Sequence, residues 1–274
     1  MKIFKIASMM MLACVSIDAE EPMIVAHRGA SRVAPENTIP AFKRAWQQGA
    51  DAIEADFHLT KDGHIVCIHD RNTQKVSGVN LVVRSVALAE LRRLDVGLSH
   101  SKAYRGTVMP TIEEVFAIIP EQKSIYIEIK CGSEIIPVLL EEIEKSNLKY
   151  EQVVVICFNK KIVQELKAKA PEIKVLWLSG FKKDKSGNIH PSPETVLTTL
   201  KQIKADGFSS THEMIDEDLI KKITNHGYEY HVWTVDEAKV ARRFKRWGAK
   251  SISTNVPGYI RKNLVEQDAV IKSR

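Results

Sequence analysis

Short apolar runs alternate with longer stretches of helical periodicity along most of the chain. The apolar runs are rich in Val and Ile, which is typical of buried strands. The expected strands are 23–26, 52–57, 65–68, 125–129, 153–158, 174–178, 207–210, 228–235 and 251–254. The helical patterns between them include 38–48, 111–119, 134–145, 160–168, 193–203, 217–225 and 236–247. This repeated alternation predicts parallel strands joined by helical crossovers.

The pattern predicts nine strands, one more than the eight of a closed barrel of this kind. Asp62-Gly63 is a hairpin signal between the second and third runs, and it predicts antiparallel pairing of these two strands. Residues 71–110 contain no clean strand–helix unit and are expected to form a small insertion. We therefore predict an α/β fold, a (βα)8 TIM barrel with a β-hairpin and a small insertion after the second strand. A single domain would span residues 20–274.

Composition places the chain among ordinary globular proteins, with 274 residues, 44% hydrophobic and 27% charged. The net charge of +6 is spread along the chain with acids in between, so nucleic acid is not an expected partner. Attraction of anionic substrates or lipid head groups fits the mild positive charge better. The basic stretch 180–190 can steer anions, but a solvated run of charge is the simpler interpretation.

The first residues have the character of a targeting segment. Lys2 and Lys5 precede the apolar run 6–17, which is too short to span a bilayer but suits a secretory signal. We expect residues 1–19 to be a signal peptide, with a lipid anchor at Cys14 as an alternative because "MLAC" is an imperfect lipoprotein-type site. The protein would then be exported, as a periplasmic protein or a membrane-anchored lipoprotein. No other segment is apolar enough to cross a membrane.

Three cysteines remain after this segment, and each lies in or beside an apolar strand pattern. Because Cys67, Cys131 and Cys157 are odd in number, we expect buried free thiols and no disulfide framework. Their spacing does not indicate a zinc site.

Two carboxylates lie two residues apart in the expected strand 52–57. Strand periodicity points Glu54 and Asp56 to the same side, where they repel each other unless a cation or protons neutralise them. A hard divalent ion such as Ca²⁺ or Mg²⁺ resolves this repulsion, because both prefer oxygen ligands. In the alternative, one acid faces solvent and the other pairs with a basic neighbour. Glu128 can add a third carboxylate, and Lys130 can contact a phosphate oxygen or simply form a salt bridge with Glu128.

Two histidines lie at ends of expected strands, where a barrel of this kind carries its chemistry. His27 ends the first strand and is followed by Arg28, and His69 ends the hairpin. Two imidazoles around one phosphate can act as general acid and general base, and a guanidinium can grip phosphate oxygens. Ordinary structural roles are the alternative for each residue alone. Phe158 and Trp233 are aromatic residues at strand ends that either pack on a small alcohol or belong to the core.

These residues belong to a longer pattern. The segments "HRGA…APENTIPAF…GADAIEADFHLTKDGHIVCIHD", "MPTIEEV", "IYIEIK" and "HVWTVD" strongly resemble the glycerophosphodiester phosphodiesterase family over residues 23–262. The resemblance implies metal-dependent hydrolysis of glycerophosphodiesters to glycerol 3-phosphate and an alcohol. Whether water or the glycerol 2-hydroxyl attacks, the latter giving a cyclic phosphate first, stays open.

The resemblance also implies roles for individual positions. The implied metal ligands, for Ca²⁺ or Mg²⁺, are Glu54, Asp56 and Glu128. The implied acid/base pair is His27 and His69, the implied phosphate contacts are Arg28 and Lys130, and the implied glycerol contacts are Phe158 and Trp233. Glu36 and Asn37 of "PENT" would support the site.

Two departures from the family pattern affect the expectations. The run "RNTQKVSGV" after His69-Asp70 differs from the family's usual one and leaves the head-group preference open. Asn255 stands where an aspartate is common, and we expect it to affect only local capping or a supporting hydrogen bond. Two other functions are weighed: phospholipase D-like action on lysophospholipid or sphingolipid, and non-catalytic binding of phosphodiesters. The block "HRGA…PENT" argues against the first, and both histidines argue against the second.

Overall fold

The computed structural model describes residues 21–272, and side chains up to residue 264. The expected signal peptide at 1–19 and the alternative anchor at Cys14 lie outside the described residues. Within the described part of the chain, no helix combines the length and the apolar character needed to span a bilayer.

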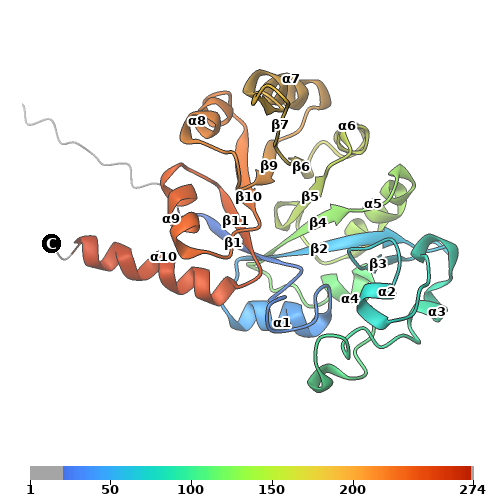
Figure 1. Ribbon diagram of the computed structural model, residues 1–274. Coiled ribbons are helices and arrows are strands. Elements are labelled where there is room, and N and C mark those ends of the chain that lie inside the picture. Colours follow the sequence, from blue (N-terminus) through green and yellow to red (C-terminus); the bar gives the residue numbers. More distant parts are fainter. Residues whose placement is uncertain (1–20, 273–274) are drawn as a thin grey trace, which may run out of the picture.

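Eight parallel strands close into a barrel, which confirms the predicted fold class (Figure 1). They are β1 (Met23–His27), β2 (Ala52–Leu59), β4 (Ser124–Ile129), β5 (Val153–Cys157), β6 (Lys174–Ser179), β9 (Gly207–Thr211), β10 (Glu229–Trp233) and β11 (Ser251–Thr254). The ring closes because β1 pairs with β11 on one side and with β2 on the other. Nearly every residue of these strands is buried, because helices cover the outer face and side chains fill the interior.

The predicted hairpin is also present. Strand β3 (Ile65–Cys67) pairs antiparallel with the end of β2. Gly63 adopts a φ of 85° in the turn, a conformation that glycine reaches without strain. The hydroxyl of Thr60 donates to Asp62 at 2.7 Å and fixes the same turn. This hairpin carries the chain from the second barrel strand to His69.

Helices surround the strands (Figure 1). They are α1 (Ile39–Gln47), α4 (Ile112–Phe116), α5 (Ile136–Lys145), α6 (Lys160–Lys169), α7 (Pro193–Ile203), α8 (Glu217–Asn225), α9 (Ala238–Arg246) and α10 (Pro257–Lys272). Side chains of Thr38, Ser192 and Asp216 cap the starts of α1, α7 and α8, as these residue types commonly do.

Residues 71–110 form short helices and loops beside β2 and β3 (Figure 1). The helices are α2 (Gln74–Ser77), η1 (Val83–Ser85), α3 (Leu88–Leu91) and η2 (Lys102–Tyr104). A separate small core holds them, made of Val66, Ile68, Val83, Leu91, Val96 and Met109. Because two of these residues come from the β3 region, the insertion is attached to the hairpin that ends in His69.

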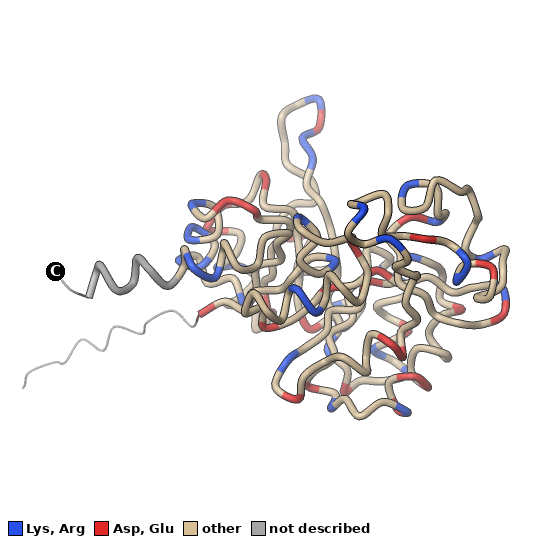
Figure 2. Tube along the Cα trace, turned by 90° about the horizontal axis from the view of Figure 1, so that it is seen from below, with Lys and Arg blue, Asp and Glu red and all other residues tan. Residues whose placement is uncertain are grey.

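A second hairpin follows β6 and was not expected from the sequence. Strands β7 (Lys182–Lys183) and β8 (Ile189–His190) have two residues each, and Gly187 has a φ of 84° in their turn. Strands this short leave no periodicity to recognise, so the lysines dominated the sequence pattern. Figure 2 shows a hairpin with lysines on both sides of one aspartate standing off the barrel.

The three cysteines of the described chain are free, as predicted. Cys67 and Cys157 are buried, whereas Cys131 is only partly buried.

Candidate active site

A cavity of about 150 Å³ opens at the carboxyl ends of the barrel strands. Every predicted site residue except Asp56 lines it: His27, Arg28, Glu54, His69, Glu128, Lys130, Phe158 and Trp233. Asp56 lies fully buried beside Glu54 and Glu128. The structure therefore brings all nine predicted site residues together in one place.

Strand geometry assembles the three carboxylates. Glu54 and Asp56 are on the same side of β2, and the β2–β4 register places Asp56 opposite Glu128. One oxygen atom from each of the three lies within 4.8 Å of the others. The side chains are withdrawn from water, with relative exposures of 2%, 0% and 9% for Glu54, Asp56 and Glu128.

Burial and mutual repulsion disturb the ionisation of these acids. Burial, with Asp56 close by, raises the pKa of Glu54 well above its ordinary value and that of Glu128 to about 7. Burial also opposes ionisation of Asp56, but the neighbouring Arg28 and Lys130 outweigh it and lower the pKa of Asp56. In the absence of a cation, the cluster thus partly relies on protons to relieve its charge.

The acid cluster fits a hard divalent cation. Oε1 of Glu54 and Oδ1 of Asp56 are buried and have no hydrogen-bond partner among the described residues. A buried acceptor without a partner costs free energy, so two adjacent ones mark a place built for another ligand. Three carboxylates converging on one point are the donor set that Ca²⁺ and Mg²⁺ prefer.

Two cations border the acids. Arg28 approaches Asp56 with its Nε 3.1 Å from Oδ2, and its backbone N–H donates to Glu54 at 2.9 Å. Its φ of 56° turns both groups toward the acids. Lys130 forms the salt bridge that the sequence left as an alternative, with Nζ 2.7 Å from Glu128 and 3.6 Å from Asp56. When all three acids are ionised, their charges and those of Arg28 and Lys130 sum to one negative charge.

The two "PENT" residues hold the acids and Arg28 in place. Asn37 donates to the Asp56 carboxylate at 2.8 Å and accepts from the Asp56 backbone N–H at 3.1 Å. Glu36 lies 3.4 Å from Arg28 and accepts from Lys75 of the insertion at 2.8 Å. The insertion therefore reaches the site through an ion pair.

His27 is oriented by a residue whose role the sequence did not reveal. Its Nδ1 lies 2.8 Å from Oδ1 of Asn255, and the Asn255 amide group donates to Asp236 at 2.8 Å. Because the Asn255 oxygen faces the ring, Nδ1 of His27 carries the proton and Nε2 keeps its lone pair. Burial and the neighbouring Arg28 lower the pKa of His27. The expected supporting hydrogen bond of Asn255 is confirmed, and its partner is His27, whose tautomer it sets.

His69 is held differently. Its Nδ1 lies 2.7 Å from the carboxylate of Asp70, a hydrogen-bond partner that fixes the orientation of the ring. His58 fixes the backbone here, because its Nε2 lies 3.2 Å from the carbonyl oxygen of His69. The sequence analysis missed His58, although the alternation Glu54, Asp56, His58 places a third polar residue on the same side of β2.

An apolar wall stands on the β5, β6 and β10 side of the cavity. The rings of Phe158 and Trp233 meet edge to face at a centroid distance of 5.7 Å, and Ile156 and Leu178 continue the wall. His231, on the same strand as Trp233, does not line the cavity. It is buried inside the barrel between Ser251 and Glu229, at 2.8 and 3.2 Å.

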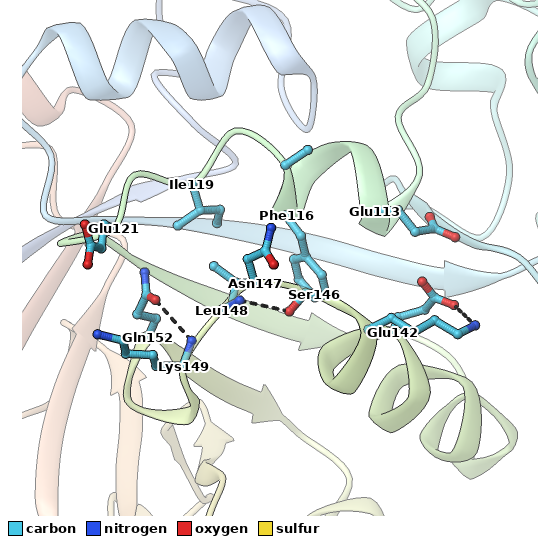
Figure 3. Close-up of a pocket in the computed structure, with 12 residues that line it drawn as sticks. Glu113, Phe116, Ile119, Glu121, Glu142, Ser146, Asn147, Leu148, Lys149 and Gln152 are labelled. Atoms are coloured by element: carbon cyan, nitrogen blue, oxygen red, sulfur yellow. Dashed lines mark hydrogen bonds and ion pairs between the residues drawn. The ribbon is translucent and has the colours of Figure 1, made fainter.

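A larger cavity of about 530 Å³ lies elsewhere, at the amino ends of β4 and β5 (Figure 3). Several of its polar groups bond to one another: Ser146 accepts from the Leu148 backbone, Gln152 accepts from the Lys149 backbone, and Lys145 pairs with Glu142. No predicted site residue lines it. Its size alone therefore does not make it a catalytic site.

Comparison with known proteins agrees with the geometry. The sequence profile of the Glycerophosphoryl diester phosphodiesterase family matches residues 27–259. A glycerophosphodiester phosphodiesterase of Caldanaerobacter subterraneus subsp. tengcongensis is 32% identical over 239 residues, which cover 86% of this chain and 94% of that protein. A Bacillus subtilis glycerophosphodiester phosphodiesterase is 27% identical over 257 residues, covering 88% and 85%.

Solved structures share the fold. A phosphodiesterase of Oleispira antarctica, determined in complex with the product sn-glycerol-3-phosphate, superimposes with a TM-score of 0.79 at 23% identity and covers 89% of this chain and 97% of that one. A glycerophosphodiester phosphodiesterase of Agrobacterium tumefaciens gives a TM-score of 0.72 at 25% identity, covering 87% and 98%.

Proposed function

We propose, since the chain belongs to the glycerophosphoryl diester phosphodiesterase family and is a phosphoric diester hydrolase, that it cleaves glycerophosphodiesters to glycerol 3-phosphate and an alcohol with the help of a divalent cation. One observation carries the proposal. Three buried carboxylates, two of them with an oxygen that accepts no hydrogen bond among the described residues, converge within 4.8 Å beside a cavity that two histidines line.

Glu54, Asp56 and Glu128 are the residues that would hold the cation. When bound, it neutralises the acids and stabilises negative charge on the phosphoryl oxygens. The charges also fit, because a divalent cation and a singly charged phosphodiester together cancel the one negative charge left by the acids, Arg28 and Lys130. Arg28 and Lys130 then face the phosphate from the protein side.

The two histidines divide the proton transfers. His27 is neutral and presents the lone pair of Nε2, so it takes the proton from the attacking hydroxyl as general base. The bond from phosphorus to the alcohol oxygen breaks, and His69 donates its Nε2 proton to that oxygen as general acid. Asp70 supports this role because its carboxylate accepts a hydrogen bond from Nδ1 and orients the ring of His69. Both water and the glycerol 2-hydroxyl satisfy this scheme as nucleophile.

The cavity suits the glycerophosphoryl end of the substrate. At about 150 Å³ it is smaller than the roughly 300–1,000 Å³ of typical drug-sized ligand sites, so the alcohol extends out through the mouth. Phe158 and Trp233 offer an apolar surface for the carbon skeleton of glycerol.

A panel assay tests the reaction and its cation together. The protein is treated with a chelator, dialysed, and assayed on glycerophosphocholine, glycerophosphoethanolamine and a long-chain lysophospholipid with Ca²⁺ or Mg²⁺ added back. We expect glycerol 3-phosphate from the first two substrates and only after a cation is restored. Full activity in chelator, or preferential cleavage of the lysophospholipid, would contradict the proposal.

The histidine roles are separable by the leaving group. We expect His27→Ala and His69→Ala each to lower the rate on glycerophosphocholine by about 10²- to 10⁴-fold. A p-nitrophenyl ester of glycerol 3-phosphate needs no proton on its leaving oxygen, so it should restore much of the rate of His69→Ala but not of His27→Ala. His64→Ala, an exposed histidine in the β2–β3 turn, is the control. If the p-nitrophenyl ester restored the rate of His27→Ala but not of His69→Ala, the general-acid and general-base roles would be reversed.

Export of the protein is a further part of the proposal. It is supported by Lys2 and Lys5 ahead of the apolar run 6–17. The mass of the protein recovered from cells expressing the full chain decides the matter. We expect a chain that begins near Glu20, whereas a diacylglyceryl adduct on Cys14 would indicate the lipoprotein and the full-length mass would contradict export.

A further inference from the structure

Three loops that are consecutive around the barrel form one side of the site's mouth. They follow β5, β6 and β9, and these strands are neighbours because β6 pairs with β5 on one side and with β9 on the other. Phe158 of the first loop lines the cavity itself. We call the loops after these three strands the β5–β6–β9 rim.

The β5–β6–β9 rim carries a concentration of exposed lysines. Lys182, Lys183 and Lys185 lie on the hairpin after β6, and Lys161 lies at the start of α6 after β5. Within the described part of the chain, none of these four side chains forms an ion pair or hydrogen bond. Figure 2 shows the hairpin lysines displaced from the body of the molecule, away from the acids of the barrel.

The one acid of the hairpin is occupied in shaping it. Asp184 accepts hydrogen bonds from the backbone N–H groups of Ser186 and Asn188 at 2.8 and 2.9 Å. The Nε2 of His190 lies 2.9 Å from the same carboxylate. Asp184 therefore does not compensate the lysines individually, and the tip of the hairpin keeps a net positive charge.

Exposed apolar side chains accompany the lysines. Ile189 on the hairpin is 40% exposed, Phe158 46% and Met214, in the loop after β9, 45%. The hairpin has a firm root, because Phe181 packs edge to face on the core residue Phe208 at 6.0 Å. A protruding, anchored element with lysines and an exposed isoleucine has the composition of a membrane-surface contact.

We infer that the β5–β6–β9 rim docks on the surface of an anionic lipid bilayer, with Ile189 at the head-group level and the hairpin lysines on acidic head groups. A bilayer suits this feature better than a nucleic acid, since an exposed isoleucine accompanies the hairpin lysines and a phosphate backbone offers it no apolar contact. Docking in this way turns the mouth of the catalytic cavity toward the membrane. The inference does not depend on the reaction proposed for the cavity.

Vesicle sedimentation tests the inference. Residues 20–274, which contain the whole barrel, are mixed with vesicles of 30% phosphatidylglycerol in phosphatidylcholine or of phosphatidylcholine alone. We expect binding to the anionic vesicles that weakens with salt, and little binding to the neutral ones. The triple variant Lys182→Ala, Lys183→Ala, Lys185→Ala should lower the partition coefficient roughly 100-fold. Ile189→Ser should lower it a further few-fold.

A matched triple variant controls for net charge. Lys43→Ala, Lys201→Ala, Lys239→Ala removes the same charge from exposed positions on α1, α7 and α9, and should bind within about twofold of the parent. Equal losses in both triples, or no preference for anionic vesicles in the parent, would overturn the inference. Binding of single-stranded poly-dT that is as tight and equally sensitive to the hairpin lysines would also overturn it. Thermal unfolding verifies each fold, and glutamine replaces alanine in any variant that fails to fold.

Discussion

Of the two cavities, the one at the amino ends of β4 and β5 is larger, whereas the one at the carboxyl ends of the barrel strands holds the buried ionisable groups. The groove at the amino ends of β4 and β5 has about 530 Å³, and its polar groups bond to one another at the surface (Figure 3). The pocket at the carboxyl ends has about 150 Å³, and three buried acids lie in or beside it. Two of these acids each have an oxygen that accepts no hydrogen bond among the described residues.

The difference shows which feature indicates function in this fold. The acids of the large groove are exposed to water or paired with a lysine, so the groove requires no ligand to explain it. Buried acids of like charge oppose folding, and a chain that keeps them gains something from them other than stability. Unsatisfied charge, and not volume, therefore distinguishes the pocket.

The largest expected effect comes from removing an acid of the carboxyl-end pocket, compared with removing an acid of the groove. Glu54→Gln keeps the shape of the side chain but removes a charge from the proposed cation site, so we expect kcat/KM on glycerophosphocholine to fall by about 10³-fold or more. Its cation-free form should unfold at a higher temperature than the parent, because a buried repulsion is gone. Kinetics and thermal unfolding with chelator measure both effects.

Glu121→Gln is the matched change in the groove. It should leave activity and unfolding temperature close to the parent values, because Glu121 is exposed. A large loss of activity in Glu121→Gln, or nearly full activity in Glu54→Gln, would remove the contrast between the two cavities.

The second prediction concerns pH. Burial raises the pKa of Glu128 from 4.5 to about 7, so the folded cation-free protein binds a proton that the unfolded chain has released. The free energy of unfolding should therefore fall as pH rises from about 4.5 through 7, by roughly 1 to 3 kcal/mol. Saturating Ca²⁺ or Mg²⁺ should restore the loss at pH 8, because the cation replaces the proton. Urea unfolding across this pH range with chelator or cation measures it.

Glu128→Gln should reduce that slope to the part that Glu54 contributes, whereas Glu142→Gln, in the groove, should leave it unchanged. A cation-free stability that rises with pH between 5 and 8 would show that the pocket acids are not under strain.

The features of this molecule that the sequence predicts are those encoded by neighbouring residues in the chain. The barrel was predictable because every strand carries its own apolar pattern, and because Asp62-Gly63 marks the one strand that reverses direction. The hairpin at Lys182–His190 was not, since two-residue strands have no period to detect. The insertion at 71–110 likewise has no regular apolar periodicity, so its short helices and its separate small core were not predicted.

The same distinction holds within the site. Glu54 and Asp56 were predictable because their spacing alone places both on one side of a strand. Asn255 lies 228 residues after the histidine that it orients, and only closure of β1 against β11 brings the two together. No local pattern reports such a contact, so its importance became visible only in the folded chain.

The smallest predicted effect sharpens the contrast between the two histidines of the pocket. His69 faces a carboxylate, whereas His27 faces the neutral amide of Asn255. Asn255→Asp places a carboxylate on Nδ1 of His27, stabilises its protonated form and raises its pKa. If His27 is the general base, the acid limb of the pH–rate profile should move up by the same amount, and activity below that limb should fall about tenfold.

The new aspartate would also meet the carboxylate of Asp236, which now accepts from the Asn255 amide at 2.8 Å. The double variant Asp236→Asn, Asn255→Asp restores a donor between the two positions while keeping the carboxylate on His27. It should retain the shifted acid limb and recover the unfolding temperature that the single variant loses. An acid limb that stays in place in both variants would mean that His27 does not act as the base, because a change of partner at 2.8 Å cannot leave a reacting imidazole unaffected.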